Sequence, residues 1–187
     1  FSHMTVLENL LVGRHIRGRA GIMSSALHTP GMRKEERQFR EKSRSLLSLF
    51  GLSEFEAHKA GSLPFGRQRR LEIARALSLD PELLLLDEPA AGLNSREKID
   101  LAGLIVSVKK QGITIIIVEH DMDLIMDISD AVFVLNFGKK IAEGTPREIQ
   151  NNPEVIKQLE TETYKDYLRN ILGNRKVMEH LKKVIVK

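Results

Sequence analysis

The sequence predicts an α/β fold that is preceded by a helical segment. Two short runs, 83–86 and 113–118, are apolar at nearly every position. Apolar runs of roughly four to eight residues are typical of strands buried on both faces of a sheet. A segment of helical length and pattern follows each run, so strands and helices alternate as they do around a mostly parallel sheet. The 187 residues suffice for one domain with a sizeable core.

The N-terminal part is expected to be helical. Thr5–Val12 predicts a helix whose first residue is the N-cap, because Glu8 follows three residues later. The Gly- and Arg-rich stretch 13–31 is expected to form a loop or a broken helix. A long charged helix is predicted over 33–50, and Gly51 is a natural residue to end it.

The α/β part is predicted to run as helix, strand, helix, strand, helix and hairpin. The expected bounds of these elements are 66–79, 83–86, 95–111, 113–118, 121–128, 131–136 and 139–143. We expect three divisions of the chain: a helical subdomain over 1–62, whose adjoining helix runs to 79; an α/β core over 63–152; and a helical, polar extension over 153–187.

Composition excludes several classes of protein. The chain has no cysteine, which excludes disulfide frameworks and thiolate metal sites and fits a cytosolic setting. No apolar run approaches the roughly 18 residues of a membrane span. The net charge of +4 is mildly basic, but aromatic residues are 5% and Trp is absent. We therefore interpret the charge as a solvated surface rather than a platform for nucleic-acid bases.

Two carboxylates, Asp87 and Glu88, follow the apolar run 83–86 directly. Ligands of open α/β sheets bind outside the carboxyl ends of the strands. A carboxylate in that place can hold Mg²⁺, and its neighbour can orient or activate a water molecule. The alternative is a turn with a solvated acidic pair.

His120 follows the second apolar run in the same way, so we expect it at the same edge of the sheet as Glu88. An imidazole there can donate a hydrogen bond to a transferring phosphoryl group. The small-residue loop 91–94 lies between them, and its alternative reading is an ordinary strand-to-helix turn with an Asn or Ser cap.

The segment 62–77 passes from a tight loop straight into a basic helix. The unpaired N–H groups of a helix start, with Gly66 permitting close approach, can bind an anion. By itself this pattern is also that of a simple turn.

Together, in this order and spacing, these pieces resemble the nucleotide-binding domain of ABC transporters, over roughly 4–153. Leu63–Arg67 is similar to the signature motif, and Leu83–Glu88 to the Walker B motif. Ala91–Asn94 is similar to the D-loop, and His120 to the switch histidine.

The resemblance implies a P-loop NTPase-like fold, expected to be truncated at its N-terminus, with ATP and Mg²⁺ as cofactors. It implies that Asp87 helps to hold Mg²⁺, that Glu88 is the general base, and that His120 contacts the γ-phosphate. It also implies nucleotide contacts, in a head-to-tail dimer, from the signature and D-loop residues, namely Leu63, Pro64, Phe65, Gly66, Arg67, Gly92, Leu93 and Asn94.

Finer details resemble the ATPases of branched-chain amino acid importers. They are carried by the segments 4–10, 68–76, 88–94, 118–122 and 143–146. This resemblance implies a second ATPase subunit, identical or not, and transmembrane permease subunits as partners. It implies a solute-binding protein as an indirect partner, no nucleic acid, and a place on the cytoplasmic face of the membrane.

The sequence departs from that pattern at several points. It contains no Gly-x-x-x-x-Gly-Lys-[Ser/Thr] loop, so we expect poor ATP affinity from these residues alone. Pro64 stands where the general family has Ser, Arg67 where it has Gln, and Asn94 where it has Asp. Two alternatives stay open: a catalytically silent fragment or interaction module, and a soluble ABC ATPase that acts on DNA or ribosomes.

One further expectation concerns the extension. We expect Val177, Leu181 and Val184 to form an apolar packing stripe there.

Overall fold

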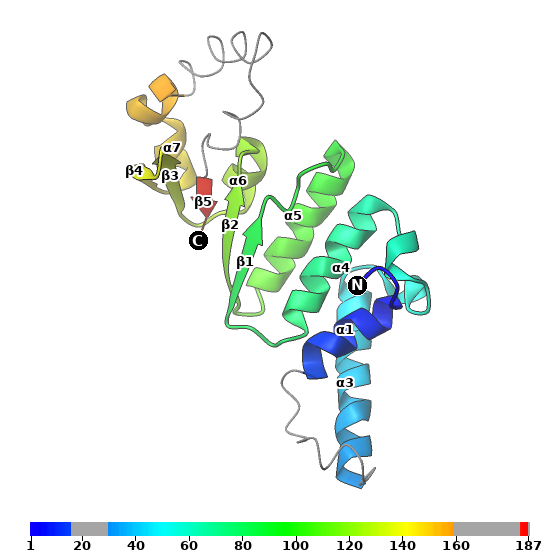
Figure 1. The fold of residues 1–187 in the computed structure, drawn as a ribbon. Coiled ribbons are helices and arrows are strands. Elements are labelled where there is room, and N and C mark those ends of the chain that lie inside the picture. The colour runs from blue at the N-terminus through cyan, green and yellow to red at the C-terminus, as the bar shows by residue number, and fades with distance from the viewer. Residues whose placement is uncertain (16–29, 159–183, 187) are drawn as a thin grey trace. The chain divides into compact units, whose positions relative to one another are not determined.

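The computed structural model describes residues 1–15, 30–158 and 184–186 (Figure 1). The chain forms two compact units, residues 1–84 and residues 85–187. The division between them falls inside a strand, β1 (Leu83–Asp87).

The first unit is helical among its described residues. Its helices are α1 (Val6–His15), α3 (Pro30–Leu49), the 3₁₀ turns η1 (Ser53–Phe55) and η2 (Ala60–Ser62), and α4 (Phe65–Leu77). The side chains of Thr5 and Glu8 bond each other's backbone N–H groups, so the predicted capping box at the start of α1 is confirmed. Gly51 ends α3 with a φ of 64°, a left-handed conformation that favours glycine.

Helices α1, α3 and α4 pack on one another. Their contact is made by apolar side chains at most 4% exposed, which include Val6, Leu10, Leu47, Phe50, Leu52, Leu71 and Ala74. Burial of each of the Val, Leu and Phe side chains stabilises the fold by roughly 1.5–3 kcal/mol, so this core holds the three helices together.

The second unit contains a sheet with the strand order β1-β2-β5-β3-β4. Its remaining elements are α5 (Ser95–Lys109), β2 (Thr114–Glu119), α6 (Met122–Ile128), β3 (Val132–Asn136), β4 (Lys139–Gly144), α7 (Pro146–Gln150) and β5 (Val184–Val186). β5 runs antiparallel to both β2 and β3, so β2 and β3 are parallel to each other. The predicted hairpin is confirmed as β3 and β4, which turn at Phe137 and Gly138 with φ values of 46° and 77°.

The core of the second unit lies between α5 and the sheet. α5 runs beside β2 (Figure 1) and contributes Leu101, Ile105 and Val108, each at most 4% exposed. From β2 come Ile115 and Ile117, which alternate with half-buried neighbours.

The structure corrects three expectations. β1 is not buried on both faces, because Leu83 and Leu85 are 48% and 67% exposed. α3 begins at Pro30, although Pro30 was expected to lie in a loop or a broken helix; the fixed φ of proline suits a helix start.

The third correction concerns the extension, predicted to be helical over 153–187. Residues 153–158 are helical, but Val184 belongs to strand β5. Its β-branched run 184–186 finds backbone partners on β2 and β3, and such pairing favours a strand over a helix. Val177 and Leu181 lie outside the described residues.

None of the described helices has the length and apolar character needed to cross a membrane.

Candidate functional site

The ends of two neighbouring strands bring Glu88 and His120 together. Glu88 follows β1 directly, and His120 follows β2 directly. The imidazole Nδ1 lies 3.9 Å from Oε1 of Glu88, which is too long for a hydrogen bond but close enough for both groups to reach one ligand. The His120 side chain is 64% exposed and the Glu88 side chain is 51% exposed, so both are open to solvent. The expectation that they share one edge of the sheet is confirmed.

Asp87 is the last residue of β1 and is exposed. Mg²⁺ is usually bound by one or two carboxylates together with phosphate and water oxygens. The donor set at this strand end, one exposed carboxylate beside Glu88, fits that pattern. Among the residues that the structure describes, no three His, Asp or Glu side chains gather as a metal cage of their own.

The backbone at Glu88 has an unusual conformation. Its φ is 45°, in the left-handed region that side-chain-bearing residues seldom adopt. Its N–H donates to the carbonyl of Val118 at 2.8 Å, and its own carbonyl accepts from Ala91 at 3.1 Å. A hydrogen bond thus holds the sharp turn after β1 against β2, and the Glu88 carboxylate lies beyond the end of the strand.

The loop that follows contains Gly92, Leu93 and Asn94. Gly92 has a φ of 77°, and Leu93 is buried. Asn94 is the N-cap of α5 and forms a reciprocal box with Glu97, with both bonds at 3.0 Å. The capping role that the sequence left as the alternative is therefore present in the structure.

The predicted signature residues Leu63, Pro64, Phe65, Gly66 and Arg67 lie in the first unit, at the start of α4. Leu63 and Gly66 are buried, whereas Phe65 is 53% exposed. Pro64 occupies the N-cap position without a side-chain hydrogen bond to the helix. The Arg67 guanidinium lies over the ring of Phe55, 4.2 Å from its centre, in a cation–π contact.

Glu119 and Lys98 also lie at this edge of the sheet, although the sequence did not predict them as site residues. Glu119, the last residue of β2, is 1% exposed, and its carboxylate accepts hydrogen bonds from the backbone. Lys98 projects from α5 and donates to Asp121 at 2.6 Å. The position of Glu119, between an apolar strand and a histidine, could have indicated it, because a charged residue at the end of a buried strand needs a hydrogen-bond or ionic partner.

The Lys98–Asp121 pair shapes the electrostatics beside His120. The hydrogen bond from Lys98 and the bond from the Leu124 N–H hold the pKa of Asp121 below its ordinary value, against the opposing effect of burial. The same pairing raises the pKa of Lys98. Asp121 also caps α6, so the same carboxylate begins that helix and pairs with a lysine.

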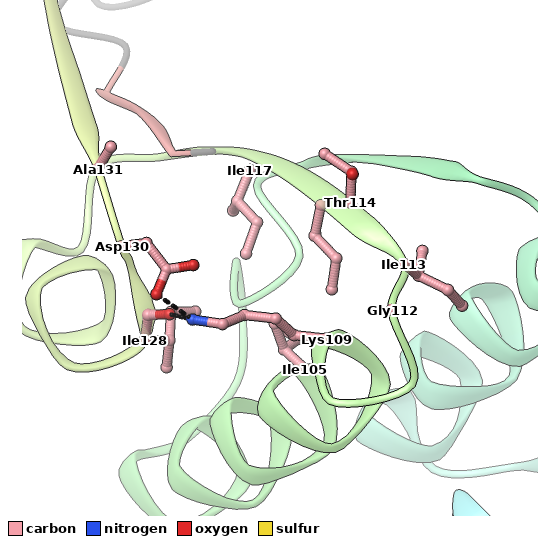
Figure 2. Close-up of a pocket in the computed structure, with 10 residues that line it drawn as sticks. Ile105, Lys109, Gly112, Ile113, Thr114, Ile117, Ile128, Asp130 and Ala131 are labelled. Atoms are coloured by element: carbon pink, nitrogen blue, oxygen red, sulfur yellow. Dashed lines mark hydrogen bonds and ion pairs between the residues drawn. The ribbon is translucent and has the colours of Figure 1, made fainter.

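Hollows of different size lie among the described residues of the second unit. One of about 380 Å³ is lined by five isoleucines and by other residues of α5, β2, the end of α6 and the segment before β3. The ion pair of Lys109 and Asp130, at 2.6 Å, lies at one side of it (Figure 2). None of the candidate site residues lines it. The smaller, about 90 Å³, is lined by Gly92, Leu93, Lys98, Glu119, His120 and Asp121, among others, and it adjoins the site.

Comparison with known proteins assigns a family. The profile described as "ABC transporter" matches residues 1–91, and the one described as "Branched-chain amino acid ATP-binding cassette transporter" matches residues 139–157. The chain is 46% identical, over 158 residues, to the "High-affinity branched-chain amino acid transport ATP-binding protein LivG" of Salmonella typhimurium. The chain belongs to the ATP-binding cassette family. It is 44% identical to the protein of the same description named BraF from Pseudomonas aeruginosa.

Solved structures of ATP-binding cassettes share the fold. The ADP conformation of one cassette of an ABC transporter matches 83% of this chain with a TM-score of 0.68 and 33% identity. A nucleotide-free ATP-binding cassette from an ABC transporter also matches 83% of this chain, with a TM-score of 0.67 and 34% identity. The alignment takes in 84% of this chain and 62% of the LivG and BraF sequences, and it also takes in 62% of each of the two solved cassettes.

Proposed function

We propose that this chain is part of the ATP-hydrolysing subunit of an importer for branched-chain amino acids. The observation that carries the proposal is the pairing of Glu88 and His120 at 3.9 Å, beyond the carboxyl ends of neighbouring strands. The similarity to relatives named as branched-chain amino acid transport ATP-binding proteins supports the choice of solute.

Each residue at this edge has a role that its chemistry suits. The Glu88 carboxylate accepts a proton from the attacking water, and its exposure leaves it accessible to that water. His120 donates a hydrogen bond to the transferring phosphoryl group, which gains negative charge in the transition state. Asp87 is the residue that would hold Mg²⁺, and that ion, when bound, neutralises charge on the phosphate oxygens.

The remaining candidate residues act in the dimer. Leu63, Pro64, Phe65, Gly66 and Arg67 would cover a nucleotide held by the second subunit, with Gly66 giving close backbone approach. Pro64 has neither a hydroxyl nor an N–H, so the contacts at this point fall to the backbone that follows it. Gly92, Leu93 and Asn94 would line the same interface. Permease subunits place the assembly on the cytoplasmic face of the membrane.

The test uses an extended chain, in which this sequence is joined at its N-terminus to the phosphate-loop segment of the Salmonella relative. Glu88→Gln should lower ATP hydrolysis by about 10²- to 10⁴-fold, because the amide cannot take the proton. ATP-dependent dimerisation, followed by size-exclusion chromatography, should persist. Glu82→Gln is the matched control, since Glu82 is an exposed carboxylate just before β1.

Hydrolysis by Glu88→Gln at the rate of the parent would show that Glu88 is not the base. Titration of the 187-residue chain itself with ATP tests the silent-module alternative, which micromolar affinity would contradict. Co-purification with nucleic acid rather than with permease subunits would favour the soluble ATPase instead.

A further inference from the structure

Glu119 is a buried carboxylate at the point where β2 ends. It is 1% exposed, and its two oxygens accept from two different backbone N–H groups. Oε1 accepts from Ala90 at 2.8 Å, and Oε2 accepts from His120 at 3.2 Å. Burial of a carboxylate is unfavourable unless such bonds compensate it, whereas an apolar side chain of similar size would fill the space without that penalty. A packing role alone therefore does not account for a charge here.

The bond from Ala90 to Glu119 holds the turn that contains Glu88. Glu88 has a φ of 45°, which is strained for a residue with a side chain. Such strain persists only where several surrounding interactions hold the backbone in place. Three hydrogen bonds do so here. Two are backbone bonds, from Glu88 to Val118 and from Ala91 to Glu88. The third is the bond from Ala90 to Glu119, in which a side chain of β2 grips the turn two residues beyond Glu88.

The second bond fastens the other strand end. His120 follows Glu119, and its N–H donates back to the same carboxylate. One buried side chain thus ties the backbone on both sides of the site, and His120 Nδ1 lies 3.9 Å from carboxylate oxygens of both Glu88 and Glu119. Lys98, which also lines the small hollow, contributes positive charge near this carboxylate.

We propose that Glu119 is a positioning residue, whose carboxylate sets the separation and orientation of Glu88 and His120 for phosphoryl transfer. The inference rests on the proposed function, since Glu88 and His120 receive their catalytic roles there. Glu119 itself does not touch nucleotide in this scheme; it acts through the two backbones that it binds.

The first arm of the test measures amide hydrogen exchange in the 187-residue chain. Glu119→Met keeps the side-chain length but offers no oxygen, so exchange at both Ala90 and His120 should rise at least about tenfold. Glu119→Gln has one oxygen and one NH₂ group, so one of the two amides should stay protected while the other rises. Asp123 is an exposed acid near Lys98, so Asp123→Asn also removes one negative charge beside that lysine. Exchange at Ala90 and at His120 should then stay within about twofold of the parent.

The second arm measures ATP hydrolysis in the extended chain. Glu119→Met should lower kcat by about 100-fold, the order expected when catalytic groups are misplaced by an ångström. The KM for ATP should stay within about twofold, and Glu119→Gln should fall between Met and the parent. A residue that only fills space would leave Met and Gln equally active.

Three results would overturn the proposal. The first is equal kcat values for Glu119→Met and Glu119→Gln, and the second is unchanged exchange at Ala90 and His120 in Glu119→Met. The third is a uniform rise in exchange at every buried amide of β2, which means a general loss of stability. If even the parent extended chain fails to hydrolyse ATP, the proposed function falls. The exchange arm then decides by itself whether Glu119 holds the two strand ends.

Discussion

Asn94 has two candidate roles, cap of α5 and contact to nucleotide, and substitutions can separate them. Asn94→Ala removes the Oδ1 that accepts from the Glu97 N–H at 3.0 Å. Loss of an N-cap side chain costs about 1 kcal/mol, which is roughly fivefold in an equilibrium constant at 25 °C. The free energy of unfolding of the second unit should fall by that amount.

The assay is urea unfolding of the 187-residue chain, combined with amide exchange at Glu97, which should rise about fivefold. Asn94→Asp keeps the acceptor and adds a negative charge at a helix N-terminus, where the helix dipole favours it. That variant should be as stable as the parent or slightly more so. Thr145→Ala removes the same kind of box from α7 and is the matched control away from the site.

Stability of Asn94→Ala within about 0.3 kcal/mol of the parent would refute the capping argument. The Asp variant then isolates the second role. In the extended chain, a changed KM for ATP at unchanged stability shows that residue 94 contacts nucleotide, because the cap is intact in that variant.

Three further predictions concern the second unit. Phe137→Asn should stabilise the β3–β4 hairpin by about 1 kcal/mol in thermal or urea unfolding, because Phe137 is 76% exposed and its φ of 46° suits Asn better; a loss of stability would contradict this. Asp121→Asn keeps the cap of α6 but removes the charge paired with Lys98, at a cost of about 0.5–1 kcal/mol at neutral pH after solvent screening. Because the pKa of Asp121 is lowered in the folded state, this advantage of the parent is complete above about pH 4 and is lost as the pH falls through the folded-state pKa; an unchanged difference in urea unfolding at about pH 3 would disprove the pairing. Ile117→Ala, at a side chain 2% exposed, should cost about 2–5 kcal/mol in urea unfolding, and the control Ile99→Ala, at one 65% exposed, should cost far less; equal losses would contradict the core assignment.

Much of the architecture follows from local chain chemistry. The Thr5–Glu8 box and the turn glycines Gly51 and Gly138 lie where the sequence predicts them, because each depends on residues within a few positions. The meeting of Glu88 and His120 was also predictable, since two strands that end at one edge of a sheet must bring their next residues together.

What the sequence could not predict depends on distant partners. Glu119 bonds to Ala90, 29 residues away, and no local pattern identifies that donor. The exposure of Leu85 depends on what lies over that face of β1, which an apolar run does not encode. The roles of the signature residues depend on a second subunit and stay a prediction.

The central place of β5 in the sheet has a consequence for biogenesis. Val186 pairs with Ile117 of β2 and with Val132 of β3. The sheet therefore cannot be completed until β5 has been synthesised, well after β2 and β3. Pairings so remote along the chain form slowly. While the nascent polypeptide is still on the ribosome, β2 and β3 would face each other across an open gap, with backbone groups available to a chaperone or to another chain.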